Sequence, residues 1–196
     1  YKDALTGVYN RRYFEEQIKK KNENAGVAVI DMDDFKLCND TLGHSVGDAA
    51  LRTMVKTVKH CIRKTDILIR YGGDEFILIL ENIKKENFFN KLVQIQSDIH
   101  AANVPGFPKL QLSVSIGGVI SSKETVEHAV MQADKLMYQA KEHKNMVVTE
   151  DNASYVAPGV ANRKARQQIL IVDDSEMNRA ILSEMLKKDF DILEAE

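Results

Sequence analysis

Three acidic residues follow one another closely at the end of an apolar segment near residue 30. The segment 27–32 is rich in Val and Ile and leads into Asp31-Met32-Asp33-Asp34-Phe35-Lys36. Carboxylates at the end of a strand can hold a hard cation, because Mg²⁺ takes one or two protein carboxylates and completes its coordination with water and phosphate oxygens. Lys36 stands where it could contact such phosphates. On its own, however, an acidic cluster of this kind is more typical of a solvated turn or a helix cap.

A second acidic pair lies in the short segment between two apolar runs. Tyr71 and Phe76 flank Gly72-Gly73-Asp74-Glu75, which is too short for a crossover helix, so the two runs must form a hairpin. The glycines are expected to adopt the positive φ angles of a primed turn and to let a nucleotide approach the backbone. A plain polar turn would explain the pair alone equally well. Two carboxylate-bearing strand ends in one sheet could, however, clamp metal ions together for phosphoryl chemistry.

Five apolar runs with the length of strands alternate with helical patterns. Strands are expected at 27–32, 67–71, 76–80, 110–120 and 146–148, and helices at 10–21, 51–62, 88–99 and 126–140. One short hairpin among longer crossovers predicts an α+β fold, with a five-stranded mixed sheet and a central antiparallel hairpin flanked by helices. The apolar stripes of the helices are interpreted as core faces.

The composition limits the classes of function. Among 196 residues, 44% are hydrophobic and 29% charged, which is typical of a globular protein. A net charge of -2 provides no basic surface, so we expect no nucleic-acid binding, and phosphate recognition must be local. Cys38 and Cys61 have no metal-ligand spacing and are too few for a disulfide scaffold, which favours a cytoplasmic location. No apolar run is as long as a membrane span, so no membrane contact is expected within this fragment.

The composition changes after residue 148. Residues 150–168 include Pro158, Gly159 and a basic patch without periodicity, and they are interpreted as a linker. The apolar run 169–172 then leads into Asp173-Asp174-Ser175, a helical pattern and a short strand at 190–193. We therefore expect one domain at 1–149, a linker at 150–168, and the β-α-β beginning of a second domain at 169–196.

Taken together, the motifs of the first domain resemble the GGDEF domain of diguanylate cyclases. The signature Gly72-Gly73-Asp74-Glu75-Phe76 is intact, and Asp3-Ala4-Leu5-Thr6-Gly7-Val8-Tyr9-Asn10-Arg11-Arg12 is similar to the family's N-terminal motif. Asp31 to Lys36, Asn39-Asp40, and Gly43-His44 through Gly47-Asp48 follow with matching spacing. Several motifs in the right order are far more specific than one glycine-rich tract. The resemblance covers about 3–149 and implies the nucleotidyl cyclase fold, which is ferredoxin-like.

The resemblance implies an enzyme of bacterial second-messenger signalling that condenses two GTP molecules into cyclic di-GMP and two pyrophosphates. Carried over by position, Asp31, the Met32 carbonyl and Asp74 are the ligands of Mg²⁺ or Mn²⁺, and Glu75 shares the acidic site. Asp74 or Glu75 would accept the proton of the attacking hydroxyl. Because one domain holds one GTP, the catalytic form would be a homodimer with its site across the two-fold interface. His44 is interpreted as a structural residue at a helix start.

The resemblance also implies the contacts with GTP. Asn39 and Asp48 would hold the guanine, because a carboxylate can accept hydrogen bonds from guanine N1 and N2. The phosphates would meet a set of basic and backbone groups, namely Phe35, Lys36, Gly72, Gly73, Lys141 and Lys144. The closing turn 142–145 is one position shorter than the family's turn and has no glycine. Lys144 could therefore instead be a helix C-terminal cation favoured by the helix dipole.

Arg63-Lys64-Thr65-Asp66 stands upstream of the hairpin. In isolation, Arg63 and Asp66 would be interpreted as exposed residues without a function. In the family that this chain resembles, Arg-x-x-Asp at this offset is the inhibitory site for the product. The arginine fork can pair with guanine O6 and N7, and the aspartate can accept from the amino edge. The resemblance thus implies feedback inhibition by cyclic di-GMP.

Residues 169–196 resemble the start of a response-regulator receiver domain, the phosphate-accepting module of two-component systems. By position, Asp173 and Asp174 would be the acidic pair that binds Mg²⁺ in such domains. The phosphate-accepting aspartate of the family lies on a later strand than these residues include.

The sequence leaves two alternatives to the active cyclase. A catalytically inactive domain could bind GTP or cyclic di-GMP as a regulatory module, although the intact signature argues against it. A cyclase that uses adenine nucleotides is disfavoured by Asp48, which adenine would leave unpaired and desolvated.

Overall fold

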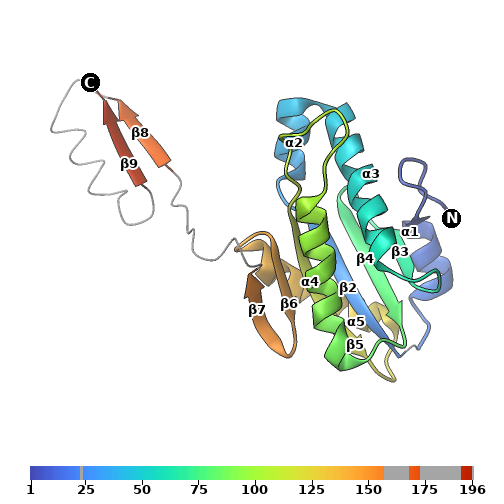
Figure 1. Cartoon of the computed structure of the whole chain (residues 1–196). Helices are drawn as coiled ribbons and strands as arrows, with labels where there is room; N and C mark the ends of the chain where they lie inside the picture. Colours follow the sequence, from blue (N-terminus) through green and yellow to red (C-terminus); the bar gives the residue numbers. More distant parts are fainter. Residues whose placement is uncertain (23, 157–167, 173–190, 196) are drawn as a thin grey trace. The chain divides into compact units, whose positions relative to one another are not determined.

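A computed structural model of the chain describes residues 1–22, 24–156, 168–172 and 191–195 (Figure 1). The chain divides into two units, Tyr1–Ala157 and Pro158–Glu196. The first unit contains every residue for which the sequence predicts a role in cyclase chemistry or its inhibition.

A mixed sheet forms the centre of the first unit. Its strands, in spatial order, are β1 (Tyr9–Asn10), β3 (Ile67–Arg70), β4 (Glu75–Glu81), β2 (Ala25–Met32), β5 (Val114–Ser121), β6 (Met146–Thr149) and β7 (Asn152–Val156). The pairs β1–β3 and β5–β6 are parallel and the others antiparallel. The predicted α+β class and the β3–β4 hairpin are confirmed. The sheet has seven strands instead of five, because the two-residue β1 and the polar β7 give no apolar run.

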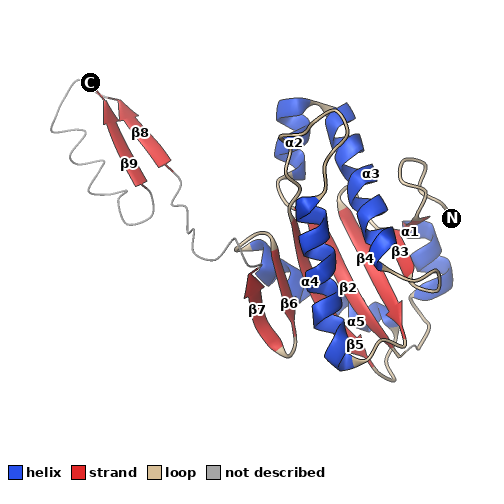
Figure 2. Cartoon of the chain, in the orientation of Figure 1, coloured by secondary structure: helices blue, strands red, loops and turns tan. Residues whose placement is uncertain are grey.

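Helices cover both faces of the sheet (Figure 2). On β2, Ala28 and Ile30 face the core formed with α3 (His44–Cys61) and α4 (Lys85–Ala101). Val27 and Val29 face the other side, where α5 (Val126–Lys141) packs. All residues of β2 are buried, which explains why its sequence is a continuous apolar run and not an alternation. Residue 31 lies on the α5 side of this strand by its alternation.

The remaining helical segments are short. The predicted helix at 10–21 is observed as one helical turn, α1 (Arg11–Tyr13), which continues as a π-helical segment, η1 (Phe14–Ile18). Helix α2 (Phe35–Leu42) follows β2 directly, and α3 begins at His44, as predicted for a helix-start residue. The predicted strand 110–120 begins later, at Val114.

The boundary of the first unit differs from the prediction. Residues 152–156, which the sequence analysis assigns to the linker, form β7 and pair with β6 across a two-residue turn. This strand lies at the edge of the sheet and has a polar composition, so its sequence carries no hydrophobic signal. The first unit therefore extends to Ala157 and not to residue 149.

In the second unit, β8 (Gln168–Val172) pairs in parallel with β9 (Asp191–Ala195). Asp173, Asp174 and the helix predicted after them lie outside the described residues. Across the ranges that the structure describes, no helix combines the length and the apolar character needed to cross a bilayer.

The contact between β5 and α5 fixes the position of the helix. A Cβ atom on Gly117 would overlap the Ala133 carbonyl oxygen and the Met137 backbone nitrogen. The helix backbone therefore lies directly on the strand, which is possible only for glycine at this position. This close packing determines where the C-terminal end of α5, with Lys141, meets the sheet.

We expect Gly117→Ala to lower the free energy of unfolding by roughly 1–3 kcal/mol, because the added methyl group must displace the backbone of α5. Urea denaturation at neutral pH measures this loss. Gly73→Ala is the matched control, since no atom lies within 4 Å of a Cβ at Gly73 and its φ is not positive. Equal losses in the two variants would contradict the packing argument.

Candidate active site

The two acidic strand ends predicted from the sequence are neighbours in the sheet. Asp31 on β2 is the register partner of Glu75 on β4 and of Ser115 on β5. The Met32 backbone N–H donates to the Asp74 carbonyl oxygen at 3.3 Å, which joins the end of β2 to the hairpin turn. The structure thus brings Asp31, Met32, Asp74 and Glu75 together, as the two separate motifs predict.

Asp31 is a buried carboxylate with one cationic partner. Its side chain is only 4% exposed, and Oδ2 lies 2.8 Å from Nζ of Lys141 at the end of α5. Burial raises the pKa of Asp31 to about 6, and the charges of Asp74 and Glu75 add to this while Lys141 opposes it. Burial would lower the pKa of Lys141, but the hydrogen bond and charge of Asp31 raise it. The site therefore gathers three acidic side chains, Asp31, Asp74 and Glu75, and Lys141 is the cation that pairs with the buried one.

The two hairpin glycines have different roles from the predicted one. Neither Gly72 nor Gly73 has a positive φ, so the expectation of a primed turn with positive φ at these glycines is wrong. The turn is instead closed by the Tyr71 and Gly72 N–H groups, which both donate to the Glu75 carbonyl oxygen, at 2.9 and 3.3 Å. A Cβ on Gly72 would lie 2.8 Å from Glu75 Oε2, so this glycine leaves room for the carboxylate. Gly73 faces open space, as expected of a position that a ligand approaches.

Arg70 holds the hairpin turn through hydrogen bonds to its backbone, a role that the sequence did not predict. Its Nε and Nη2 donate to the Gly73 carbonyl oxygen at 3.0 and 2.7 Å, and its Nη1 donates to both carboxylate oxygens of Asp3 at 3.2 Å. Asp3 also accepts from the N–H and hydroxyl of Thr6, at 2.9 and 2.6 Å. The N-terminal motif thus contributes to the site by holding the hairpin turn.

The residues predicted to hold guanine lie on consecutive helices. Asn39 is on α2 and Asp48 on α3, and Gly47 allows the two helices to approach, because a Cβ there would overlap Asn39 Oδ1. Asn39 Oδ1 is buried without a hydrogen-bond partner. The Asp48 side chain is 46% exposed, with Arg52 Nη2 3.9 Å from its Oδ2. Both groups accept hydrogen bonds, so they are suited to a ligand edge that carries donors, and the Asn39 side-chain NH2 is the group that could donate to a ligand acceptor.

The shortened closing turn places Lys144 at the start of α2. Lys144 Nζ donates to both carboxylate oxygens of Asp34 at 2.8 Å. Asp34, Lys144 and Asn145 all have positive φ, at 55°, 54° and 48°. Lys144 therefore reaches the region of Phe35 and the exposed Lys36 despite the missing glycine.

The donor chemistry of the site fits a hard divalent cation. Asp31 and Asp74 offer carboxylate oxygens and Met32 a carbonyl, which are the ligand types that Mg²⁺ accepts alongside water and phosphate. The raised pKa of Asp31 reflects the burial of its carboxylate and, secondarily, the charges of Asp74 and Glu75, and a bound cation would favour the ionised form. Within the described part of the chain, no three His, Cys, Asp or Glu side chains are gathered closely enough to form a complete metal cage. This arrangement suits a cation that brings most of its ligands as water and substrate oxygens.

Arg63 and Asp66 lie beyond the end of α3, away from the acidic site. The Asp66 carboxylate is already occupied by backbone, because Oδ2 accepts from Arg63 N–H at 2.7 Å and Oδ1 from Glu81 N–H at 3.1 Å. The exposed Arg63 lines a cavity of about 450 Å³ together with Asn82, Asn87, Asn90, Lys91 and Gln94. The surface around Arg63 is therefore rich in amide and cationic groups.

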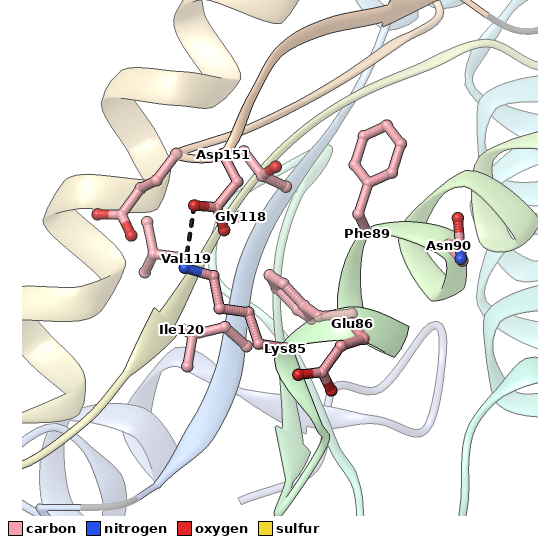
Figure 3. Close-up of a pocket in the computed structure, with 11 residues that line it drawn as sticks. Lys85, Glu86, Phe89, Asn90, Gly118, Val119, Ile120 and Asp151 are labelled. Carbon is pink, nitrogen blue, oxygen red and sulfur yellow. Dashed lines mark ion pairs between the residues drawn. The ribbon is translucent and has the colours of Figure 1, made fainter.

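A further cavity, of about 540 Å³, lies at the opposite end of β5 from the acidic site (Figure 3). It is lined by Gly118 and Ile120 of β5 and by the first turn of α4, and Lys85 forms an ion pair with Asp151 there at 2.9 Å. None of the residues with a predicted role lines this cavity.

Comparison with known proteins finds relatives of the first unit. Residues 1–146 match the family model described as diguanylate cyclase, GGDEF domain. The chain is 30% identical over 149 residues to the probable diguanylate cyclase DgcC of Escherichia coli (strain K12), covering 71% of this chain and 40% of that protein. It is 36% identical over 149 residues to the diguanylate cyclase DgcS of Shewanella oneidensis, covering 71% and 49%. The chain thus spans less than half the length of either relative.

Solved structures show the same architecture. The diguanylate cyclase SiaD of Pseudomonas aeruginosa, in complex with its activator SiaC, matches with a TM-score of 0.69 and 30% identity over 76% of this chain and 61% of that chain. The GGDEF domain of DgcB from Caulobacter crescentus, in complex with c-di-GMP, matches with a TM-score of 0.69 over 76% of this chain and 95% of that chain. At 24% identity, the second match concerns the fold alone.

The brace between Asp3 and Arg70 gives a pH-dependent prediction. Burial alone would raise the pKa of Asp3, but the hydrogen bonds from Thr6 and Arg70 together lower it. A carboxylate with a lowered folded-state pKa stabilises the fold above its unfolded pKa, and this contribution is lost as the pH falls through the folded value. We expect Asp3→Asn to be less stable than the wild type by roughly 1 kcal/mol at pH 7, with the difference shrinking towards pH 3.

Urea denaturation of both proteins at several pH values measures this difference. Asp40→Asn is the control, because Asp40 is exposed on α2 and its replacement should leave the stability difference near zero at each pH. A destabilisation by Asp3→Asn that is the same at pH 3 and pH 7 would show that the charge of Asp3 is not what stabilises the brace.

Proposed function

The chain belongs to the GGDEF family of diguanylate cyclase domains, and from this premise we propose that its first unit condenses two GTP molecules into cyclic di-GMP and two pyrophosphates. The observation that carries the proposal is the pairing of two acidic strand ends next to a lysine. Asp31 is the register partner of Glu75, and Lys141 forms an ion pair with Asp31. That arrangement is suited to phosphoryl transfer and not to a purely structural turn.

Asp31, Asp74 and the Met32 carbonyl are the groups that would hold Mg²⁺ or Mn²⁺. When bound, the ion would polarise the α-phosphate and neutralise charge that develops on the leaving pyrophosphate. Lys141 and Lys144 stand beside this site, 2.8 Å from Asp31 and Asp34, and would pair with the triphosphate tail. Lys36 and the backbone at Phe35, Gly72 and Gly73 would complete the phosphate contacts.

In each of the two condensations, the 3′-oxygen of one GTP forms a bond to the α-phosphorus of the other. The bond from that phosphorus to the bridging oxygen breaks, and pyrophosphate leaves with the electron pair. The proton of the 3′-hydroxyl passes to a carboxylate, for which Asp74 and Glu75 are the candidates because they directly follow Gly73, which faces open space. Glu75 keeps its place through the space that Gly72 leaves.

Selectivity for guanine would come from Asn39 and Asp48. The Asp48 carboxylate can accept from guanine N1 and N2, and the amide of Asn39 can serve the acceptor atoms of the base. Adenine would leave Asp48 without a donor in a desolvated site, which weakens its binding. Because each domain offers one such set, the two GTP molecules would be brought together by a homodimer.

The setting of the domain follows from its substrate and its thiols. GTP is a cytoplasmic nucleotide, and Cys38 and Cys61 are both free thiols, which fits a reducing compartment. We therefore place this domain in the cytoplasm. We further propose that the second unit is the start of a receiver domain, supported by the parallel pairing of β8 with β9, which is the pairing that the predicted β-α-β beginning requires.

Asp74→Asn tests the catalytic site. We expect it to lower cyclic di-GMP formation by at least about a hundredfold, because it removes a charged ligand and a candidate proton acceptor, with stability changed by less than about 0.5 kcal/mol. Incubation with GTP and Mg²⁺ followed by nucleotide chromatography measures the product, and repeating it over a range of protein concentrations tests the need for a dimer. Asp151→Asn, in the exposed ion pair with Lys85, is the control that should retain activity.

Full activity of Asp74→Asn would refute the site assignment. A wild-type protein that binds GTP or cyclic di-GMP but forms no product at any protein concentration would favour the inactive regulatory module. ATP added to the same assay should not compete with GTP, and effective competition would contradict the role of Asp48 in selecting guanine.

We also propose that Arg63 and Asp66 form the site of product inhibition. Arg63 is the sharper residue to test, because Asp66 also binds two backbone N–H groups and its loss would disturb the fold. We expect Arg63→Ala to raise the concentration of cyclic di-GMP needed for half-inhibition by about tenfold or more, since a bidentate arginine–guanine contact is lost.

Initial rates at increasing cyclic di-GMP measure this change. Arg12→Ala is the control, because Arg12 is engaged with Glu16 at 2.6 Å and should leave inhibition unchanged. Half-inhibition of Arg63→Ala at the wild-type concentration would show that the product binds elsewhere.

A further inference from the structure

Asp33, which carries no predicted role, collects hydrogen bonds from two distant parts of the chain. Ser115 Oγ donates to its Oδ1 at 2.7 Å, and its Oδ2 accepts from both Ser113 Oγ and the Asn145 backbone N–H, the latter at 2.9 Å. The Asp33 backbone N–H also donates to the Ser113 carbonyl oxygen at 2.9 Å. One carboxylate thus ties the end of β2 to the start of β5 and to the turn after α5.

These contacts leave Asp33 little freedom to act on a ligand. Each carboxylate oxygen already accepts at least one hydrogen bond from the protein. Asp31, two residues earlier, instead faces a lysine and other acids. The geometry therefore separates a carboxylate that is available to a substrate or cation from one that is committed to the fold.

The segment that Asp33 holds is the unusual closing turn. Lys144 and Asn145 both have positive φ without being glycine, a conformation that is unfavourable for a lysine and persists only where surrounding contacts hold it. Buried Gln96 fixes the carbonyl of Asn145 at 2.8 Å from its Nε2, and Asp33 fixes the N–H of the same residue. Both the N–H and the carbonyl of Asn145, the residue after Lys144, are thus held by hydrogen bonds. The Lys144 amine itself donates to the Asp34 carboxylate.

We propose that Asp33 is a positioning residue that holds the closing turn, so that Lys144 stands at the start of α2 where the triphosphate would lie. This rests on the proposed function for the role of Lys144, but the anchoring itself does not. Because Asp33 acts through Lys144, its loss should remove the benefit of Lys144 without removing the reacting groups on β2 and the hairpin.

Two substitutions separate the anchor from the charge. Asp33→Asn can place its amide oxygen towards Ser113 and the Asn145 N–H and its amide nitrogen towards the Ser115 hydroxyl, which can accept. It should keep the turn, with a KM for GTP within about twofold of the wild type. Asp33→Ala has no acceptor, and we expect its KM to rise about tenfold with a much smaller change in kcat.

A double-mutant cycle with Lys144→Ala then tests the route of the effect. Lys144→Ala should raise KM in the wild type but have little further effect in Asp33→Ala, because the lysine is already misplaced. Ser121→Ala is the matched control: this serine is also buried on β5, its Oγ has no partner, and its replacement should leave KM unchanged.

Hydrogen–deuterium exchange gives a readout that needs no catalysis. Peptides that contain the Asn145 N–H should exchange faster in Asp33→Ala and as slowly as the wild type in Asp33→Asn. If Asp33→Ala does not fold, Asp33→Ser takes its place, because its shorter side chain cannot reach the same donors. A wild-type protein without cyclase activity would refute the proposed function but leave this exchange test intact.

Unchanged exchange in Asp33→Ala would overturn the proposal. A rise in KM on Lys144→Ala that is as large in the Asp33→Ala background as in the wild type would also overturn it. So would a tenfold rise in KM in Asp33→Asn with normal exchange, because the charge of Asp33 and not its anchoring would then be the important property.

Discussion

A carboxylate buried at the end of the central strand is the constraint on which the rest of the site depends. Burying a charged group is costly unless it is paired, so Asp31, whose side chain is only 4% exposed, requires a cation nearby. That cation is Lys141, at the last residue of α5. The helix can deliver it only by lying directly on β5, and this close approach requires Gly117. The buried acid, the helix and the glycine in the neighbouring strand therefore form one requirement.

The elements that could be predicted are those whose signal is local. The apolar runs of β2, β4 and β6 and the stripes of α3 to α5 follow from burial, and the short spacing between β3 and β4 required a hairpin. The sequence also led us to expect the two acidic strand ends to be neighbours in one sheet, and the structure pairs Asp31 with Glu75. By contrast, β7 is a polar edge strand with no hydrophobic pattern, so the sequence suggested a linker where the sheet in fact continues.

The parts that could not be predicted depend on contacts between distant residues. The bonds of Asp33 span separations of 80 to 112 residues, and the brace between Arg70 and Asp3 spans 67. Ser113 and Ser115, two polar positions in the apolar run 110–120, are a sequence signal of an acceptor nearby. Gly72 shows the same limit, because its role comes from the room it leaves for Glu75 and not from its own φ.

Asp31 and Asp33 show how one short motif supplies two functions. Asp33 accepts hydrogen bonds from neutral donors, two serine hydroxyls and one backbone N–H, which a triphosphate has no charge to attract away. These bonds can therefore persist whether or not a nucleotide is present. Lys141 and Lys144, in contrast, each neutralise a carboxylate, Asp31 and Asp34. On the proposed function, a triphosphate that takes these lysines would leave both carboxylates without a partner, and the penalty would be greatest for the buried Asp31. Nucleotide binding would therefore favour a cation at Asp31. The requirement for a metal in the nucleotide complex would follow from the same burial that requires Lys141 when no nucleotide is bound.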